Sequence, residues 1–355
     1  MAIFTDVFED VTKQGRKIPT SDYHETGVHP IIDQGQSAIA GYTDETDGLF
    51  TDVPAIIFGD HTRVLKYVDT PCFLGADGVK LLKAKIANPN YKYLYYVLSS
   101  ANIPNTGYNR HFKWLKEVNI PLPNIDEQQK IVDTLDKIGE LITLRKEQLV
   151  KLDQLVKSQF IELSNEWGCE AKPLQEFLDD ITYGFTNPMP DAEEGPWKIT
   201  AKDVVNGKIN FDTARKTTLQ AYEELTAKSK PNIGTVLLTK DGTLGRCAVV
   251  EEDGICVNQS VAVLKCNKKI LPKFLAILLQ IPEYQREMLK NAGGGTIKHI
   301  YITKVVDMLV MVPDVSQQLK FLTFVEQTDK SKLAIQQSLD KLELLKKSLM
   351  QDYFG

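Results

Sequence analysis

The 355-residue sequence predicts a mixed α/β (α+β) fold, in which two similar globular domains are joined by two long antiparallel coiled-coil helices. The first observation is an internal repeat, because the stretch from Pro123 to Phe160 matches the stretch from Pro313 to Met350 at a constant offset of 190 residues. The second is that both stretches carry apolar residues with a 3.5-residue period, which is typical of coiled coils. Together they indicate a tandem duplication with pseudo-twofold symmetry, in the order globule, helix, globule, helix.

The repeat also sets the expected domain boundaries. Lys151–Ser158 aligns with Lys341–Ser348 without a gap, and Val7–Thr12 aligns with Phe177–Thr182 at an offset of 170 residues. Because the offset grows from 170 to 190, the second half carries about twenty extra residues. We therefore expect a first globular domain at 1–122, a first helix at 123–168, a second globular domain at 169–312 and a second helix at 313–355.

The two repeated helices have marked ends and a continuous apolar stripe. Asn124 with Glu127, and Asp314 with Gln317, are N-cap and N3 pairs that follow a proline, while Gly168 ends the first helix. One such helix cannot bury its stripe alone, so we expect the two to pair within the chain; pairing with separate partner helices is the alternative. The expected packing residues are Ile131, Leu135, Ile138, Ile142, Leu149, Leu152 and Val156 in the first helix, and Phe321, Val325, Ile335, Leu339, Leu342 and Leu349 in the second.

Short apolar runs between turn residues predict strands in both globular domains. In the first domain they are Ala55–Phe58 and Val79–Leu82, followed by a helix at Tyr91–Leu98. In the second domain they are Thr235–Leu238, Cys247–Val250 and Val261–Leu264, followed by one helix from Pro272 to Lys290.

Composition and charge exclude several classes of protein. Five cysteines without a Cys-x-x-Cys pair indicate neither a disulfide framework nor a zinc site, and a reducing cytoplasm is the expected location. There is no secretory signal and no apolar run long enough to span a membrane. The net charge is −5, yet residues 61–116 carry 9 Lys and Arg against 2 acids, and residues 228–304 carry 12 against 6. Each globular domain therefore has a basic segment of the kind that binds nucleic acid, and solvated faces of ordinary domains are the alternative that charge alone leaves open.

Catalytic motifs are missing from the sequence. There is no phosphate-binding loop of the Gly-x-x-x-x-Gly-Lys-Ser/Thr type and no Gly-x-Ser-x-Gly nucleophile elbow. The run Gly293–Gly295 follows a predicted helix rather than a strand, so it indicates a flexible loop instead of a dinucleotide site. We expect no catalytic residues, no metal site and no cofactor in this chain.

Side chains suited to DNA gather in the two basic segments. Lys and Arg match guanine O6/N7 or phosphate, whereas Asn and Gln match adenine N6/N7. The pairs Arg110-His111 and Lys298-His299 are the strongest candidates because the duplication repeats them, although an ordinary surface role is the alternative for any single residue. The candidate DNA-binding residues are His61, Arg63, Lys80, Arg110, His111 and Lys113 in the first domain, and Lys240, Asp241, Asn258, Gln259, Lys298 and His299 in the second.

Several motifs carry a family resemblance over essentially the whole chain. The first is residues 121–123 (Pro-Leu-Pro) followed by Glu127–Val132. The others are Leu237–Gly242, Asn258–Val261, Gly295–His299 and the C-terminal segment Lys341–Ser348. With the two-fold repeat, these motifs make the chain similar to the specificity subunits (HsdS) of type I restriction-modification systems.

The resemblance implies a division of labour between this chain and its partners. The globular domains would be target recognition domains that each read one half of a split DNA sequence, with the paired helices as a spacer. The chain would have no catalytic site, and would recruit two adenine-methylating subunits that use S-adenosylmethionine and motor-nuclease subunits that use ATP and Mg²⁺. The predicted function is sequence-specific binding of double-stranded DNA in a restriction-modification complex; a stand-alone Mg²⁺-dependent nuclease and a coiled-coil assembly scaffold are the alternatives.

Overall fold

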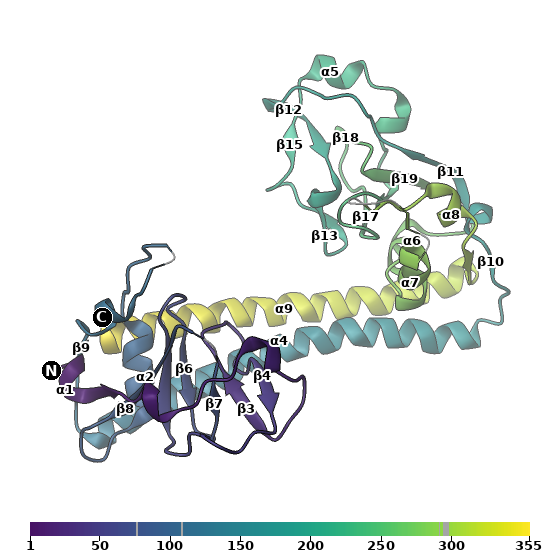
Figure 1. The fold of residues 1–355 in the computed structure, drawn as a ribbon. Helices are drawn as coiled ribbons and strands as arrows, with labels where there is room; N and C mark the ends of the chain where they lie inside the picture. Colours follow the sequence, from purple (N-terminus) through teal and green to yellow (C-terminus); the bar gives the residue numbers. More distant parts are fainter. Residues whose placement is uncertain (76, 108, 291, 294–297) are drawn as a thin grey trace. The chain divides into compact units, whose positions relative to one another are not determined.

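The chain divides into two compact units. A computed structural model describes residues 1–75, 77–107, 109–290, 292–293 and 298–355. The first unit comprises Met1–Gln148 and Ile335–Gly355, and the second comprises Leu149–Ala334. Each unit therefore contains a globular module and part of both long helices (Figure 1). We call residues 1–124 module 1 and residues 167–314 module 2.

Module 1 is built on an antiparallel sheet of four strands in the order β2-β8-β5-β6. Along β5, Ile56 and Phe58 pack toward α2 and the long helices, whereas Ala55 and Ile57 pack toward a second layer that includes β3 and β7. Both faces of β5 are buried, which explains why its sequence is a continuous apolar run. The elements of the first half of the chain are β1 (Ala2–Ile3), α1 (Phe4–Val7), β2 (Phe8–Asp10), η1 (Thr12–Gln14), η2 (Thr20–Asp22), β3 (His29–Ile32), β4 (Gly41–Thr43), β5 (Ala55–Gly59), β6 (Leu65–Val68), β7 (Phe73–Leu74), β8 (Val79–Ala84), α2 (Tyr91–Ser100), α3 (Phe112–Leu115), β9 (Asn119–Ile120) and α4 (Ile125–Glu166).

Module 2 repeats this topology. Its main sheet has the order β11-β19-β16-β17, and the three-stranded sheet β15-β12-β18 has one antiparallel and one parallel pair, as β4-β3-β7 has in module 1. The predicted duplication is therefore visible in the strand order. The elements of the second half are β10 (Lys172–Pro173), η3 (Leu174–Phe177), β11 (Leu178–Tyr183), β12 (Ala192–Ile199), η4 (Ala201–Asp203), β13 (Val204–Val205), β14 (Lys208–Ile209), β15 (Arg215–Lys216), α5 (Leu219–Glu223), η5 (Ala227–Ser229), β16 (Val236–Thr239), β17 (Cys247–Val249), β18 (Ile255–Val257), β19 (Val261–Cys266), α6 (Pro272–Leu278), α7 (Pro282–Lys290), α8 (Ile302–Val306), β20 (Leu309–Val310) and α9 (Val315–Phe354).

The strands expected in both modules are present, and one expected helix is wrong in extent. The single helix expected from Pro272 to Lys290 is two helices, α6 and α7. Pro282 is the first residue of α7, and a proline has no N–H with which to continue the hydrogen bonds of the preceding helix. The chain therefore turns between Leu279 and Ile281 before the second helix begins.

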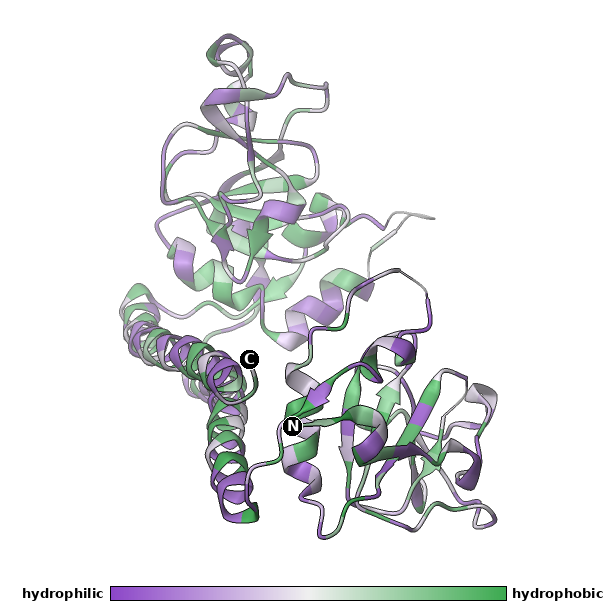
Figure 2. Ribbon diagram, turned by 90° about the vertical axis from the view of Figure 1, so that its left-hand side faces the viewer, coloured by the Kyte–Doolittle hydropathy of each residue, from purple (hydrophilic) through white to green (hydrophobic). Residues whose placement is uncertain are grey.

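The long helices have the N-cap residues that the sequence predicts. Asn124 Oδ1 accepts a hydrogen bond from Glu127 N at 2.9 Å, and Asp314 Oδ1 accepts one from Gln317 N at 3.0 Å. α4 has 42 residues and α9 has 40. In Figure 2 hydrophobic and hydrophilic residues alternate along both helices, as expected for helices with one packed face.

Within each unit, the parts of α4 and α9 run antiparallel and pack on each other. In the first unit Lys146 Nζ lies 2.8 Å from Glu343 Oε1, and in the second Lys332 Nζ lies 2.6 Å from Asp153 Oδ1. The predicted packing residues are all buried or half-buried, whereas most of the residues between them are exposed. The apolar stripe of both helices is therefore covered within each unit, partly by the other helix and partly by the core of the module, to which Leu135, Val156 and Phe321 belong.

Candidate nucleic-acid interface

In module 2, three chain segments meet at one end of the main sheet. Lys240 is the residue that follows β16. Its backbone N–H donates to the carbonyl oxygen of Ser260, the residue before β19, at 2.9 Å. Its carbonyl oxygen accepts a hydrogen bond from Ile300 N at 2.8 Å. Because β16 and β19 are antiparallel, the end of one strand lies beside the start of the other. This arrangement gathers six of the predicted residues: Lys240, Asp241, Asn258, Gln259, Lys298 and His299.

The side chains of four residues in this region contact one another, and we call them the Asp241 cluster. Asp241 Oδ1 lies 2.7 Å from His299 Nδ1, and Asp241 Oδ2 lies 3.0 Å from Lys240 Nζ. The same ammonium lies 5.3 Å from the centre of the ring of Tyr183, which is the last residue of β11 and 47% exposed. Sequence analysis missed Tyr183, and the signal for it was an exposed aromatic residue at the end of a strand.

The remaining predicted residues of module 2 differ in what they offer to a ligand. Asn258 Oδ1 accepts a hydrogen bond from Ser260 N at 3.1 Å, so this amide shapes the turn before β19. The side chains of Gln259 and Lys298 are exposed. Of the predicted motif Gly295–His299, residues 295–297 lie outside the described residues.

In module 1, His111 has a structural position. It is fully buried, its Nδ1 lies 2.9 Å from the carbonyl oxygen of Asp60, and its own N–H donates to the same oxygen at 2.7 Å. Asp60 Oδ1 also accepts from Phe112 N at 2.8 Å. Asp60 is the residue after β5, and Lys240 is the residue after β16. In both modules the carbonyl of this residue accepts a backbone hydrogen bond from a later loop, from His111 N in module 1 and from Ile300 N in module 2. The histidine of the repeated pair is buried in module 1 and half-exposed in module 2.

The cations predicted in module 1 surround α3. Lys113 Nζ lies 4.1 Å from the centre of a Trp114 ring, Lys80 Nζ lies 5.1 Å from that of Phe112, and Arg110 is exposed just before the helix. Lys116, which sequence analysis missed, lies 4.9 Å from the centre of the Phe112 ring.

Two further predicted residues, His61 and Arg63, lie in the turn after β5 and are half-buried. Arg63 has a φ of 64° and donates through Nη1 to Ile103 O at 3.1 Å.

Lys80 is also paired with Asp10, whose Oδ2 lies 2.9 Å away. Burial raises the pKa of Asp10, but hydrogen bonds from Thr12 and Lys80 outweigh burial and leave that pKa below its ordinary value. The Asp10 carboxylate therefore stays charged near neutral pH and offsets the charge of Lys80. The exposed cations Arg110 and Lys113 carry the positive surface of this region.

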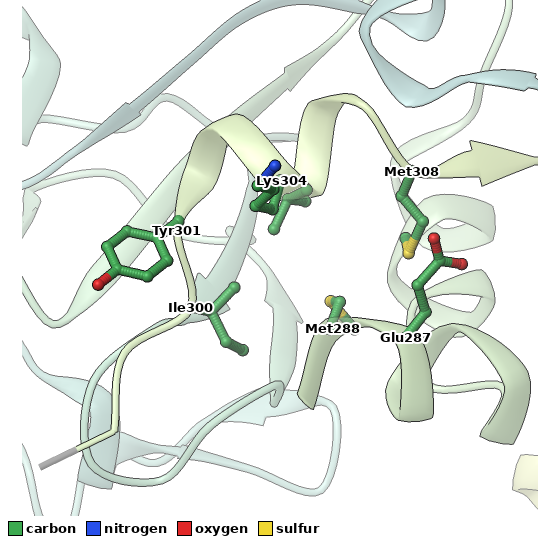
Figure 3. Close-up of a pocket in the computed structure, with 7 residues that line it drawn as sticks. Glu287, Met288, Ile300, Tyr301, Lys304 and Met308 are labelled. Carbon is green, nitrogen blue, oxygen red and sulfur yellow. The ribbon is translucent and has the colours of Figure 1, made fainter. Parts of the chain in front are cut away.

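The described residues around these surfaces offer no metal site, and the cavity beside Ile300 is small. A larger apolar hollow of about 450 Å³ lies elsewhere in the second unit and is lined by residues that include Ile233, Val249 and Leu322. No group of three or more His, Cys, Asp or Glu side chains among the described residues could hold a metal ion. The cavity beside Ile300, between α7 and α8, has a volume of about 10 Å³, which is room for about one water (Figure 3). None of the helices in the described ranges combines the length and apolar character needed to cross a bilayer.

Comparison with known proteins assigns the family. A family model described as "Type I restriction modification DNA specificity domain" matches residues 4–154 and 189–345. The chain belongs to this family. Type I restriction-modification specificity proteins recognise DNA sequences, so the predicted family and the predicted DNA recognition are confirmed. The match supports DNA recognition over the nuclease and scaffold alternatives.

Relatives and solved structures agree with the family assignment. The chain is 26% identical to the EcoR124I/EcoR124II specificity subunit of Escherichia coli, over 93% of this chain and 87% of that protein. It is 23% identical to the EcoBI specificity subunit of the same organism, over 68% of this chain and 58% of that protein.

Among solved structures, the S subunit of a type I system from M. genitalium has a TM-score of 0.55 at 16% identity, covering 99% of this chain and 95% of that one. A chain from a study of complex assembly in a type I system has a TM-score of 0.60, again at 16% identity and with the same coverage. These likenesses confirm the predicted fold class.

Proposed function

We propose that modules 1 and 2 each read one half of a split, asymmetric DNA sequence. The observation that carries this proposal is the repeated strand order, β2-β8-β5-β6 in module 1 and β11-β19-β16-β17 in module 2, with different side chains after the corresponding strands β5 and β16. The same scaffold with different surface chemistry suits two different half-sites. DNA-binding proteins with two such surfaces read half-sites at a defined spacing.

The candidate residues divide into two roles in this proposal. Exposed cations such as Arg110, Lys113 and Lys298 would contact phosphates or guanine, and the exposed amide of Gln259 would contact adenine. The other candidates would complete the two surfaces, and they are His61, Arg63, Lys80, Lys240, Asp241, Asn258 and His299. His111 is fully buried, so we assign it to the support of the module 1 loop.

Partners would supply the chemistry. We propose that the chain binds two methyltransferase (modification) subunits that use S-adenosylmethionine, and restriction subunits that use ATP and Mg²⁺, and that it acts in the cytoplasm without catalytic groups of its own. Family membership supports these partners. The stand-alone nuclease alternative is tested by incubating the purified chain with DNA and Mg²⁺, where we expect neither cleavage nor methylation.

The proposal is tested with the chain co-expressed with its methyltransferase partner. Base-resolved mapping of methylated adenines should give a two-part motif with a fixed gap, and a single contiguous motif would contradict two reading modules. Arg110→Ala and Lys298→Ala should each weaken binding of the mapped sequence by about 1–3 kcal/mol. The matched control is Lys151→Ala, an exposed lysine on α4 outside both modules, which should leave the affinity unchanged.

A further inference from the structure

His299 is the exposed member of a histidine, carboxylate and lysine group. The Asp241 and Lys240 side chains are 17% and 16% exposed, against 43% for His299. Both oxygens of Asp241 already accept hydrogen bonds, from His299 Nδ1 and from Lys240 Nζ. Because this carboxylate is covered and both of its oxygens already have partners, a base reaches it less readily than it reaches His299. His299 is therefore the side chain of this group that DNA can reach.

Main-chain hydrogen bonds hold this arrangement in place. Asp241 and His299 form an antiparallel bridge although they lie 58 residues apart in the sequence. His299 N donates to Gly293 O at 2.7 Å, and Gly293 N donates to His299 O at 3.0 Å. The backbone of His299 is thus fixed by two separate segments before any ligand binds. Side chains that are held in advance lose less conformational entropy on binding.

The carboxylate determines which ring nitrogen of His299 is available. A carboxylate beside Nδ1 favours the tautomer that carries its proton on that nitrogen and leaves Nε2 for another partner. In a neutral imidazole this second nitrogen accepts a hydrogen bond. Among base edges in the major groove, the donors are the amino groups of adenine (N6) and cytosine (N4).

We propose that His299 is a base-reading residue that accepts a hydrogen bond through Nε2 from an adenine or cytosine amino group, and that Asp241 is a positioning residue that acts through His299. The proposal rests on the proposed function, because it requires module 2 to contact DNA. Lys240 balances the charge of Asp241, and the Tyr183 ring lies beside its ammonium.

A double-mutant cycle tests the proposal. The full chain, assembled with its methyltransferase partner, selects sequences from a pool of randomised duplexes, and base preferences are compared for wild type, His299→Ala, Asp241→Asn and the double variant. Each single variant should weaken the preference at the same one position of one half-site by about 2- to 12-fold, the range expected for a single hydrogen bond. Asp241→Asn should add nothing in the His299→Ala background, since residues that act through one contact are not additive.

Two controls separate positioning from general damage. Asp191→Asn is the matched control, because Asp191 also accepts from two cations, Lys198 and Arg215, and should leave every base preference unchanged. Lys298→Ala should lower the affinity and reduce the salt dependence, and it should not change the preference at the position that His299 reads.

The inference is overturned if His299→Ala leaves all base preferences intact, or if Asp241→Asn costs as much with His299 absent as with it present. If wild type selects no sequence in that half-site, the proposed function fails as well.

Discussion

Phe160→Ala would remove the aromatic side chain by which α4 joins the core of the second unit. Phe160 is 2% exposed, and its ring centre lies 5.1 Å from that of Trp167, 5.8 Å from that of Phe274 and 5.5 Å from that of Phe321. Trp167 is the residue that follows α4, whereas Phe274 belongs to α6 and Phe321 to α9. One substitution thus weakens the contact between both long helices and module 2.

The expected loss of stability is about 3–5 kcal/mol, the usual cost of truncating a buried phenylalanine to alanine. The loss combines the transfer free energy of the ring with the cavity left between three other aromatic rings. Because natural domains have a stability of only about 5–15 kcal/mol, a loss of this size should unfold the second unit at much lower denaturant concentrations.

Urea denaturation followed by tryptophan fluorescence measures the effect, since Trp167 contacts the substituted ring. The matched control is Leu155→Ala, which removes an apolar side chain from the same helix at a position that is 44% exposed. We expect the control to change stability by no more than about 0.5 kcal/mol. If Phe160→Ala and Leu155→Ala unfold at the same urea concentration, the packing described for α4 is incorrect.

Three further substitutions test the helix contacts. Asp136→Ala should destabilise the first unit by about 2–3 kcal/mol, because Asp136 on α4 accepts hydrogen bonds from Lys92 and Tyr96 of α2. Urea denaturation measures this loss. The control is Asp133→Ala, which removes an exposed carboxylate nearby on the same helix. Asn124→Ala should cost about 1 kcal/mol by removing the N-cap of α4, and a thermal melt in which Asn124→Ser restores the loss would support capping. Hydrogen bonds from Ser316 and Gln317 hold the pKa of Asp314 in the folded state below its ordinary value of 3.8. The charged carboxylate therefore stabilises the folded state above pH 3.8, and this stabilisation is lost as the pH falls through the lower pKa of the folded state. The melting temperatures of wild type and Asp314→Asn should therefore converge in acid, and a constant difference would contradict this account.

The long helices and most strands follow from local sequence patterns. Three such patterns are an N-cap side chain, a 3.5-residue apolar period and a run of apolar residues between turns. Each involves only residues that are close in the sequence, so it can be recognised without knowledge of the fold. Gln128 and Gln318, which occupy equivalent positions in the repeat, also have the same role. Each donates through Nε2 to the carbonyl oxygen of the proline five residues earlier. The distances are 2.9 Å to Pro123 and 2.8 Å to Pro313. The helix expected from Pro272 to Lys290 is the one predicted with the wrong extent. Pro282 interrupts it, although the apolar pattern continues across this proline.

The candidate DNA surfaces were only partly predictable. The sequence marked Lys240, Asp241 and His299 by residue type, but the contact between Asp241 and His299 depends on an antiparallel bridge between positions 58 residues apart. Tyr183 enters the same cluster only because β11 pairs with β19.

The sequence by itself determined the duplication, the helices and the residue types available for DNA. The tertiary structure alone decided which member of a matched pair faces solvent: His111 is enclosed by the loop after β5, whereas His299 stays half-exposed beside Asp241. The physical reason is that burial depends on what packs against a residue from distant parts of the chain, and no local pattern carries that information.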